Sequence, residues 1–167
     1  MYTEAPRASL WRRLTAITYD ALVLCALWMF AGLIAALFVQ ALVSLNVISL
    51  QGYVDLADYM NSGWRNWLYL AYLALVTLWF YMYFWLKAGQ TLGMRAWRML
   101  LISADGKPVT KRQAFIRLLA SLGGIGNFWL WIRWGKGLAL QDQVAGTIVV
   151  VLSKEQTNAL NLHRDAR

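Results

Sequence analysis

Residues 14–45 form an apolar run that is long enough to cross a membrane and contains a single charged residue, Asp20. As a helix this run is about 47 Å long, whereas the hydrocarbon core of a bilayer is about 30 Å thick. The helix is therefore either tilted, or its span begins near Tyr19 after an interfacial turn. In the first case Asp20 lies in hydrocarbon, where a carboxylate is costly and is usually paired and functional. In the second case Asp20 lies just below the headgroups, where an ordinary interfacial carboxylate needs no such role.

A second apolar run, residues 67–86, contains no charged residue. The chain is 60% hydrophobic and 14% charged, whereas a soluble domain is usually about a quarter charged. Between the two runs, residues 46–66 are polar, and residues 53–60 favour a short amphipathic helix on the outer surface. These features predict two membrane spans joined by an external loop.

Residues 87–113 form a basic segment after the second run. Within it, residues 96–103 (AWRMLLIS) favour a β-strand, and residues 104–108 favour a turn because they contain Gly and Pro. Residues 146–153 (GTIVVVLS) are the strongest strand signal in the chain and are too short to span as a helix. We therefore expect these two strands to pair at the membrane surface, the second lying in a tail formed by residues 136–167.

Residues 114–135 are apolar but broken in the middle by three glycines within four residues. Each glycine costs a helix about 1 kcal/mol relative to alanine, so two short half-helices around a turn fit better than one span. This segment is expected either to re-enter the membrane or to form a third span. The predicted fold class is an all-α membrane protein with two transmembrane helices, this broken segment and a small cytoplasmic β-ladder.

The distribution of Lys and Arg predicts the orientation of the chain in the membrane. With the N-terminus inside, two spans and a re-entrant third segment, fifteen of the sixteen Lys and Arg residues lie on the cytoplasmic side, and Arg65 lies outside. A full third span would instead place Lys136, Lys154, Arg164 and Arg167 outside. The bias therefore favours both termini inside, and it accounts for the basic charge without a nucleic-acid partner.

Three motifs follow one another along the chain: WRRL leading to YD (residues 11–20), GQTLGMR (residues 89–95) and QDQVAGTIVV (residues 141–150). This combination resembles the RDD family of small bacterial membrane proteins, which is named for one arginine and two aspartates. The resemblance covers about residues 9–151 and implies that the three residues are Arg13, Asp20 and Asp142.

The resemblance further implies a single membrane domain over residues 1–167, located in the bacterial inner membrane. The family is associated with transport, including sodium–proton antiport. One position departs from the family, whose members often carry His or Gly before the second aspartate. This chain has Gln141 there, and a neutral amide cannot relay protons near pH 7.

We expect the candidate site to be a charge network near the inner end of the first helix. Arg13 and Asp20 are about two helical turns apart and lie on one face, with a rise of roughly 10 Å. Pairing of the two strands would bring the other members close to them. The expected network consists of Arg13, Asp20, Arg95, Arg117 and Asp142.

The ionisation of Asp20 separates two functions. Beside arginines, Asp20 stays ionised and acts as part of a structural network; without them it binds a proton or a cation, as an ion-coupled carrier requires.

A further cluster alternates aromatic and basic residues, a pattern typical of contacts with anionic lipid headgroups. Its members are Trp129, Trp131, Arg133, Trp134 and Lys136.

Three functions therefore remain open. The first is an oligomeric ion or small-solute transporter that uses Asp20, since two spans alone enclose no pathway. The alternatives are a structural or accessory membrane subunit and an anionic-lipid-interacting protein. We expect no enzyme, metal or cofactor, because the sole histidine, His163, lies in a polar tail without a nucleophile or Cys partners.

Overall fold

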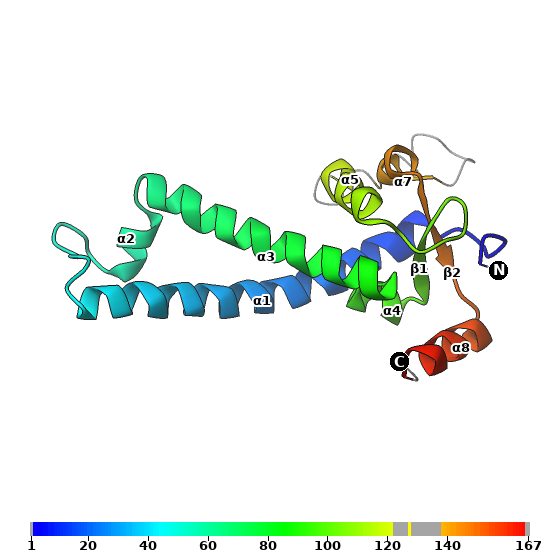
Figure 1. Cartoon of the computed structure of the whole chain (residues 1–167), viewed down its shortest axis with the longest axis horizontal. Coiled ribbons are helices and arrows are strands. Elements are labelled where there is room, and N and C mark those ends of the chain that lie inside the picture. Colours follow the sequence, from blue (N-terminus) through cyan, green and yellow to red (C-terminus); the bar gives the residue numbers. More distant parts are fainter. Residues whose placement is uncertain (1, 122–126, 128–137, 166–167) are drawn as a thin grey trace. The chain divides into compact units, whose positions relative to one another are not determined.

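The computed structural model describes residues 2–121, 127 and 138–165. The chain forms two compact units, which we call the sheet unit and the hairpin unit. The sheet unit combines Met1–Ala21 with Phe80–Arg167, and the hairpin unit is Leu22–Trp79. Two long helices, α1 (Leu10–Ser44) and α3 (Trp64–Ala88), each contribute residues to both units (Figure 1).

The hairpin unit consists of the later part of α1, the first part of α3 and the short helix α2 (Leu56–Asn61) between them. The Trp28 indole nitrogen donates to Thr77 Oγ1 at 2.9 Å, which joins α1 to α3 within this unit. Helix α2 begins after Asp55, whose carboxylate accepts the Asp58 backbone N–H as an N-cap. The short helix expected near residues 53–60 is therefore present, with its start three residues later.

Both long helices are long and apolar enough to cross a membrane, and little of either apolar stretch is buried. A core helix of a soluble protein would bury such residues, whereas here large apolar side chains on both helices are exposed. They include Met29, Phe30, Leu37, Phe38, Trp67, Leu75 and Trp79. The two predicted spans are thus confirmed as candidate membrane-spanning helices, and α1 is one continuous helix from Leu10 onward.

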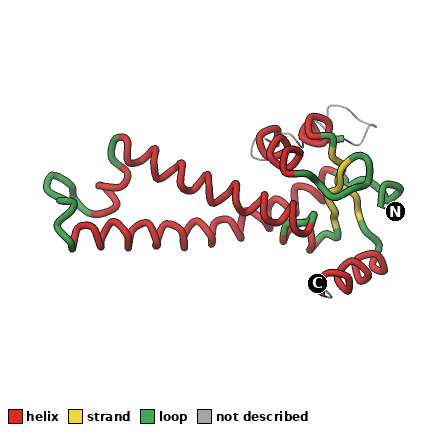
Figure 2. The backbone as a smooth tube through the Cα atoms, viewed as in Figure 1, coloured by secondary structure: helices red, strands yellow, loops and turns green. Residues whose placement is uncertain are grey.

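The sheet unit is built around two antiparallel strands, β1 (Met99–Ser103) and β2 (Thr147–Val151). Their register pairs Met99 with Val151 and Ser103 with Thr147. Figure 2 shows these strands among the surrounding helices and loops. The predicted pairing of these two segments is confirmed. The first strand begins later than expected, because α4 (Leu92–Ala96) ends at the first of the expected strand residues and a turn at residues 97–98 follows it.

Both faces of this small sheet are buried, which explains why its strands are apolar at nearly every position. On one face, Met99, Leu101 and Val149 pack with Ala16 of α1 and Trp85 of α3. On the other face, the alternate strand residues pack with partly buried side chains that include Leu160 of α8 (Lys154–Asp165). Because successive strand residues point to opposite faces, this short sheet contributes side chains to the apolar clusters on both of its faces.

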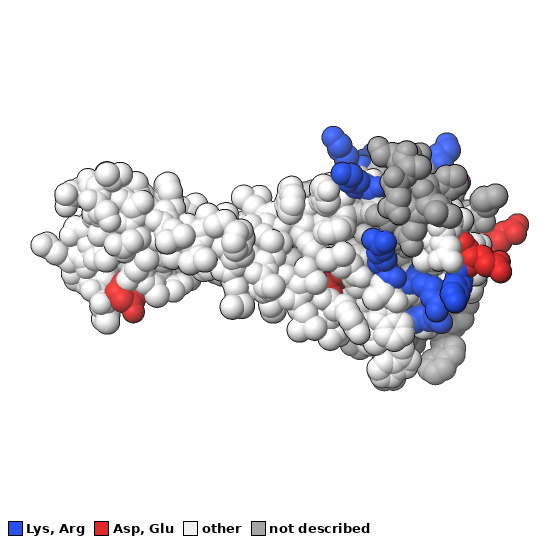
Figure 3. All heavy atoms as spheres, turned by 90° about the horizontal axis from the view of Figure 1, so that it is seen from below, with Lys and Arg blue, Asp and Glu red and all other residues white. Residues whose placement is uncertain are grey.

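Two further helices of the sheet unit are α5 (Lys111–Ser121) and α7 (Leu140–Ala145). Helix α5 covers the first part of the segment expected to be broken (residues 114–135). The glycines of this segment lie outside the described residues, as does the rest of its second half apart from Asn127. Fifteen of the sixteen Lys and Arg residues belong to the sheet unit, and Arg65 belongs to the hairpin unit. Figure 3 shows basic side chains gathered over the sheet unit.

Candidate functional site

Asp142 lies at the centre of a buried ion-pair cluster in the sheet unit. One carboxylate oxygen, Oδ1, accepts from Arg117 Nη1 of α5 at 2.5 Å, and the other, Oδ2, accepts from Arg13 Nη2 of α1 at 2.7 Å. Oδ2 also accepts the Ala139 backbone N–H at 3.2 Å, at the start of α7. Asp142 therefore joins three helices that lie far apart in the sequence.

Both arginines of this cluster have additional partners. Arg13 Nε donates to the Ala8 carbonyl at 3.2 Å, and Arg117 Nη1 donates to Thr147 Oγ1 at 2.7 Å. The ring of Trp85 lies 5.6 Å from the guanidinium carbon of Arg117. The exposed fractions of Arg13, Arg117 and Asp142 are 4%, 6% and 1%. Two guanidinium groups and one carboxylate are thus held out of water, so removing the carboxylate would leave two buried positive charges.

Electrostatics keeps Asp142 ionised. Burial by itself raises the pKa of Asp142, but the positive charges of Arg117 and Arg13 and their hydrogen bonds lower it below its ordinary value of 3.8. A group with a lowered pKa stabilises the folded state fully above its unfolded-state pKa, and this contribution is lost as the pH falls.

We therefore expect acid to weaken the protein through this cluster. The free energy of unfolding should fall as the pH drops below about 3.8, and this slope should be shallower in Asp142→Asn than in wild type. Chemical unfolding of both proteins from pH 3 to pH 7 measures the two slopes. Equal slopes would contradict the assignment of the lowered pKa to Asp142.

Asp20 makes a second, separate contact in the same unit. Its Oδ2 accepts from Thr91 Oγ1 at 2.6 Å, and its Oδ1 accepts from the Gly93 backbone N–H at 2.8 Å. Thr91 is the N-cap of α4, and its hydroxyl oxygen accepts the Met94 backbone N–H at 3.2 Å. A carboxylate is favourable at a helix N-terminus, where backbone N–H groups lack intrahelical partners. Asp20 therefore ties α1 to the first turn of α4.

The close approach of α1 and α4 depends on Gly93. A Cβ atom added at Gly93 would lie 2.9 Å from the Ala16 carbonyl carbon and 3.0 Å from Asp20 Oδ1, and still nearer to the Ala16 carbonyl oxygen. The absent side chain lets the backbone of α4 lie directly against that of α1. The GQTLGMR motif therefore supplies both a capping threonine and a contact glycine for Asp20.

The structure brings three of the five residues of the expected network together. Arg13, Arg117 and Asp142 come together as expected, whereas Asp20 binds α4 and is paired with no Arg or Lys among the described residues. The reason is distance, because side chains two helical turns apart are separated by about 10 Å and salt bridges form at three or four residues. Arg95 lies in the last turn of α4 and is exposed.

Sequence reasoning did not assign roles to Thr91, Gly93 and Thr147, although all three lie in the motifs. A threonine before a short helix is an N-cap signal that would have marked Thr91. Gln141, which departs from the family pattern, is buried, and its amide nitrogen donates to Asn127 Oδ1 at 2.7 Å. The proposed lipid contacts Trp129, Trp131, Arg133, Trp134 and Lys136 lie outside the described residues.

The described part of the chain holds no cluster of metal-ligating side chains. Within those residues, no group of three or more His, Cys, Asp or Glu side chains lies close enough to hold a metal ion. The carboxylates of Asp20 and Asp142 instead accept hydrogen bonds from protein donors. What the arrangement does is join helices through buried polar contacts.

Comparison with known proteins places the chain in a family. The family model described as the RDD family matches residues 7–152, which cover the hairpin unit and most of the sheet unit. The searches of curated proteins and of solved structures gave no match. Together with two exposed apolar helices, the family match indicates a membrane protein. The chain belongs to the RDD family.

Proposed function

We propose that this chain is a structural or accessory subunit of the bacterial inner membrane, in which Arg13, Asp20 and Asp142 lock the sheet unit together. One observation carries this proposal: Asp142 bonds two buried arginines from different helices, at 2.5 and 2.7 Å. A carboxylate engaged in this way is not available to a moving ion. On this proposal, the arginine and two aspartates for which the family is named stabilise the folded sheet unit.

The orientation follows from the same division of charge. The sheet unit carries almost all basic residues, so the positive-inside rule puts it in the cytoplasm. The charge-free part of α3, between Arg65 and Lys87, is about 32 Å long and matches the hydrocarbon thickness. We therefore place the N-terminus inside, with α1 and α3 crossing the membrane. The basic charge of the sheet unit suits contact with a protein partner or with anionic lipid.

A second candidate function, ion-coupled transport, rests on Asp20. Asp20 is 3% exposed, and no Arg or Lys among the described residues balances its charge. Such a carboxylate can serve as a proton- or cation-binding group. Since two spans enclose no pathway, this candidate requires a homo-oligomer or a membrane partner.

Replacing Asp20 by asparagine separates the two candidates. If Asp20 is structural, we expect the free energy of unfolding to fall by about 1–2 kcal/mol, because two bonds to a charged acceptor become weaker or are lost. Cation-driven proton flux in liposomes would then change only with the amount of folded protein. If Asp20 carries ions, the flux per folded protein is lost, whatever the change in stability.

The matched control is Asp105→Asn. This change removes the same charge from the sheet unit at an aspartate whose side chain is 56% exposed. It should alter neither flux nor the free energy of unfolding by a measurable amount. Measuring both quantities on the same preparations keeps a folding defect from being read as a transport defect.

A further inference from the structure

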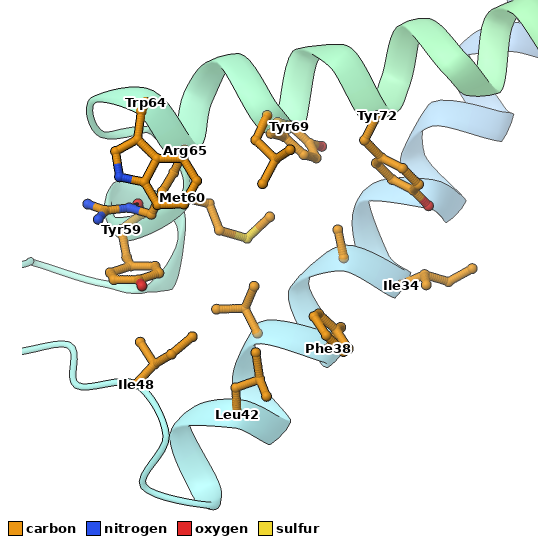
Figure 4. Close-up of a pocket in the computed structure, with 13 residues that line it drawn as sticks. Ile34, Phe38, Leu42, Ile48, Tyr59, Met60, Trp64, Arg65, Tyr69 and Tyr72 are labelled. Atoms are coloured by element: carbon orange, nitrogen blue, oxygen red, sulfur yellow. Dashed lines mark hydrogen bonds between the residues drawn. The ribbon is translucent and has the colours of Figure 1, made fainter.

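A pocket of about 510 Å³ lies in the hairpin unit between the last turns of α1 and the first turns of α3 (Figure 4). Its walls are almost entirely apolar and include Phe38 and Leu42 of α1 and Leu68 of α3. Met60 of α2 extends into the space between the helices in Figure 4. A narrow apolar pocket between two candidate spans is suited to a hydrocarbon chain.

Arg65 lies at the end of this pocket, near the start of α3. Its Nε donates to the Tyr59 carbonyl at 2.6 Å, and its Nη2 donates to the Tyr53 hydroxyl at 2.5 Å. The Tyr59 and Tyr53 rings lie 4.1 and 4.8 Å from the guanidinium carbon, as cation–π contacts. Nη1 makes no hydrogen bond with the described residues. One side of a fixed guanidinium therefore stays available to an anion.

Tyr69 adds a polar group one helical turn below Arg65. The two residues are four apart on α3, so they lie on one face about 6 Å apart along the helix axis. The Tyr69 hydroxyl makes no hydrogen bond with the described part of the chain and lies against Gly32. The pocket thus offers a cation near one end, a hydroxyl one turn further along α3, and apolar walls.

The aromatic residues around Arg65 indicate that this end of the pocket lies at the level of the lipid headgroups. Trp64 and Trp67, which flank Arg65, are 70% and 73% exposed, as is typical of aromatic residues at the headgroup level. A phospholipid has the complementary sequence of groups: an anionic phosphate, ester oxygens below it and then acyl chains. A helix of a second copy fits less well, because three turns of helix about 10 Å wide occupy roughly 1,000 Å³.

We propose that this pocket binds one phospholipid from the leaflet at which α1 ends. Its phosphate contacts Arg65, an ester oxygen accepts from the Tyr69 hydroxyl, and one acyl chain lies between α1 and α3. This binding site is independent of the charge cluster in the sheet unit. The proposal of a lipid site is therefore the same whether the chain is an accessory subunit or a transporter.

The test reconstitutes the full chain in vesicles of phosphatidylcholine containing a small fraction of phosphatidylglycerol with a diazirine in the first half of one acyl chain. After irradiation, we expect labelled peptides to concentrate in residues 34–42 and 60–72. In Ala35→Trp, where the indole fills the pocket, this labelling should fall about tenfold. Ala36→Trp adds the same bulk at the next position, which does not line the pocket, and should leave labelling unchanged.

Arg65→Gln provides a second readout that does not require filling the pocket. Wild type should label several-fold more with the phosphatidylglycerol probe than with a phosphatidylcholine probe of the same chain, and this preference should fall toward one in the variant. Labelling spread evenly over all exposed apolar residues, or equal in Ala35→Trp and wild type, would overturn the proposal. Cross-links between two copies at residues 34–42, formed with a bifunctional protein cross-linker in the same vesicles, would also overturn it and assign the pocket to a second copy.

Discussion

Replacing Asp142 by asparagine is expected to lower the free energy of unfolding by about 3–5 kcal/mol. Both carboxylate oxygens accept from arginine nitrogens, so an asparagine necessarily turns its amide nitrogen toward one of these donors. The variant leaves two buried guanidinium groups without a counter-charge. Since a domain is stable by about 5–15 kcal/mol in total, this single change removes a large fraction of its stability.

A graded set of variants checks this mechanism. Arg13→Gln leaves Arg117 and Asp142 as a neutral pair, so its loss of stability should be smaller than that of Asp142→Asn. Asp105→Asn at an exposed position should have almost no effect. Chemical unfolding of all three variants in the same detergent measures the order. A loss in Arg13→Gln equal to or larger than that in Asp142→Asn would contradict a cluster organised around the carboxylate.

The second large effect is expected for Gly93→Ala. In isolation, alanine favours a helix over glycine by about 1 kcal/mol, so propensity alone predicts a more stable α4. The added Cβ would instead overlap the Ala16 carbonyl, which belongs to the helix backbone and cannot rotate away. We expect a net loss of about 3 kcal/mol, at the upper end for an overpacked contact.

The sign of the change decides this prediction. Thermal unfolding of Gly93→Ala in detergent should show a lower melting temperature than wild type, together with faster proteolysis near α4. Because Asp20 bonds the Gly93 N–H, the variant should also weaken the Asp20 contact. An unchanged or higher melting temperature would show that α1 and α4 do not lie in direct backbone contact.

The spans and strands were predictable because their signals are local. Two long apolar runs, the first interrupted by Asp20 alone, and two short apolar runs identify α1, α3 and the strand pair from composition and length alone. The ends of these elements were less certain. Helix α1 begins at Leu10, before its apolar run, and its first turns belong to the sheet unit, where Arg13 is buried and Arg12 is exposed.

The partners of the charged residues were not predictable in the same way. Asp20 and Thr91 are 71 residues apart, and Arg13 and Asp142 are 129 residues apart, so no local pattern links them. The spacing of Arg13 and Asp20 indicated a shared helix face, but a shared face two turns apart is not a contact. The motifs identified the right segments, and only the fold shows that Thr91 and Gly93 receive Asp20.

The most direct test of the central claim is a double-mutant cycle between Arg13 and Asp142. The free energies of unfolding of wild type, Arg13→Gln, Asp142→Asn and the double variant are measured in one detergent. If the two residues lock the sheet unit together, the double variant loses less stability than the sum of the single variants, with a coupling of about 1–3 kcal/mol. Additive losses, or single variants as stable as wild type, would contradict the structural role of the cluster.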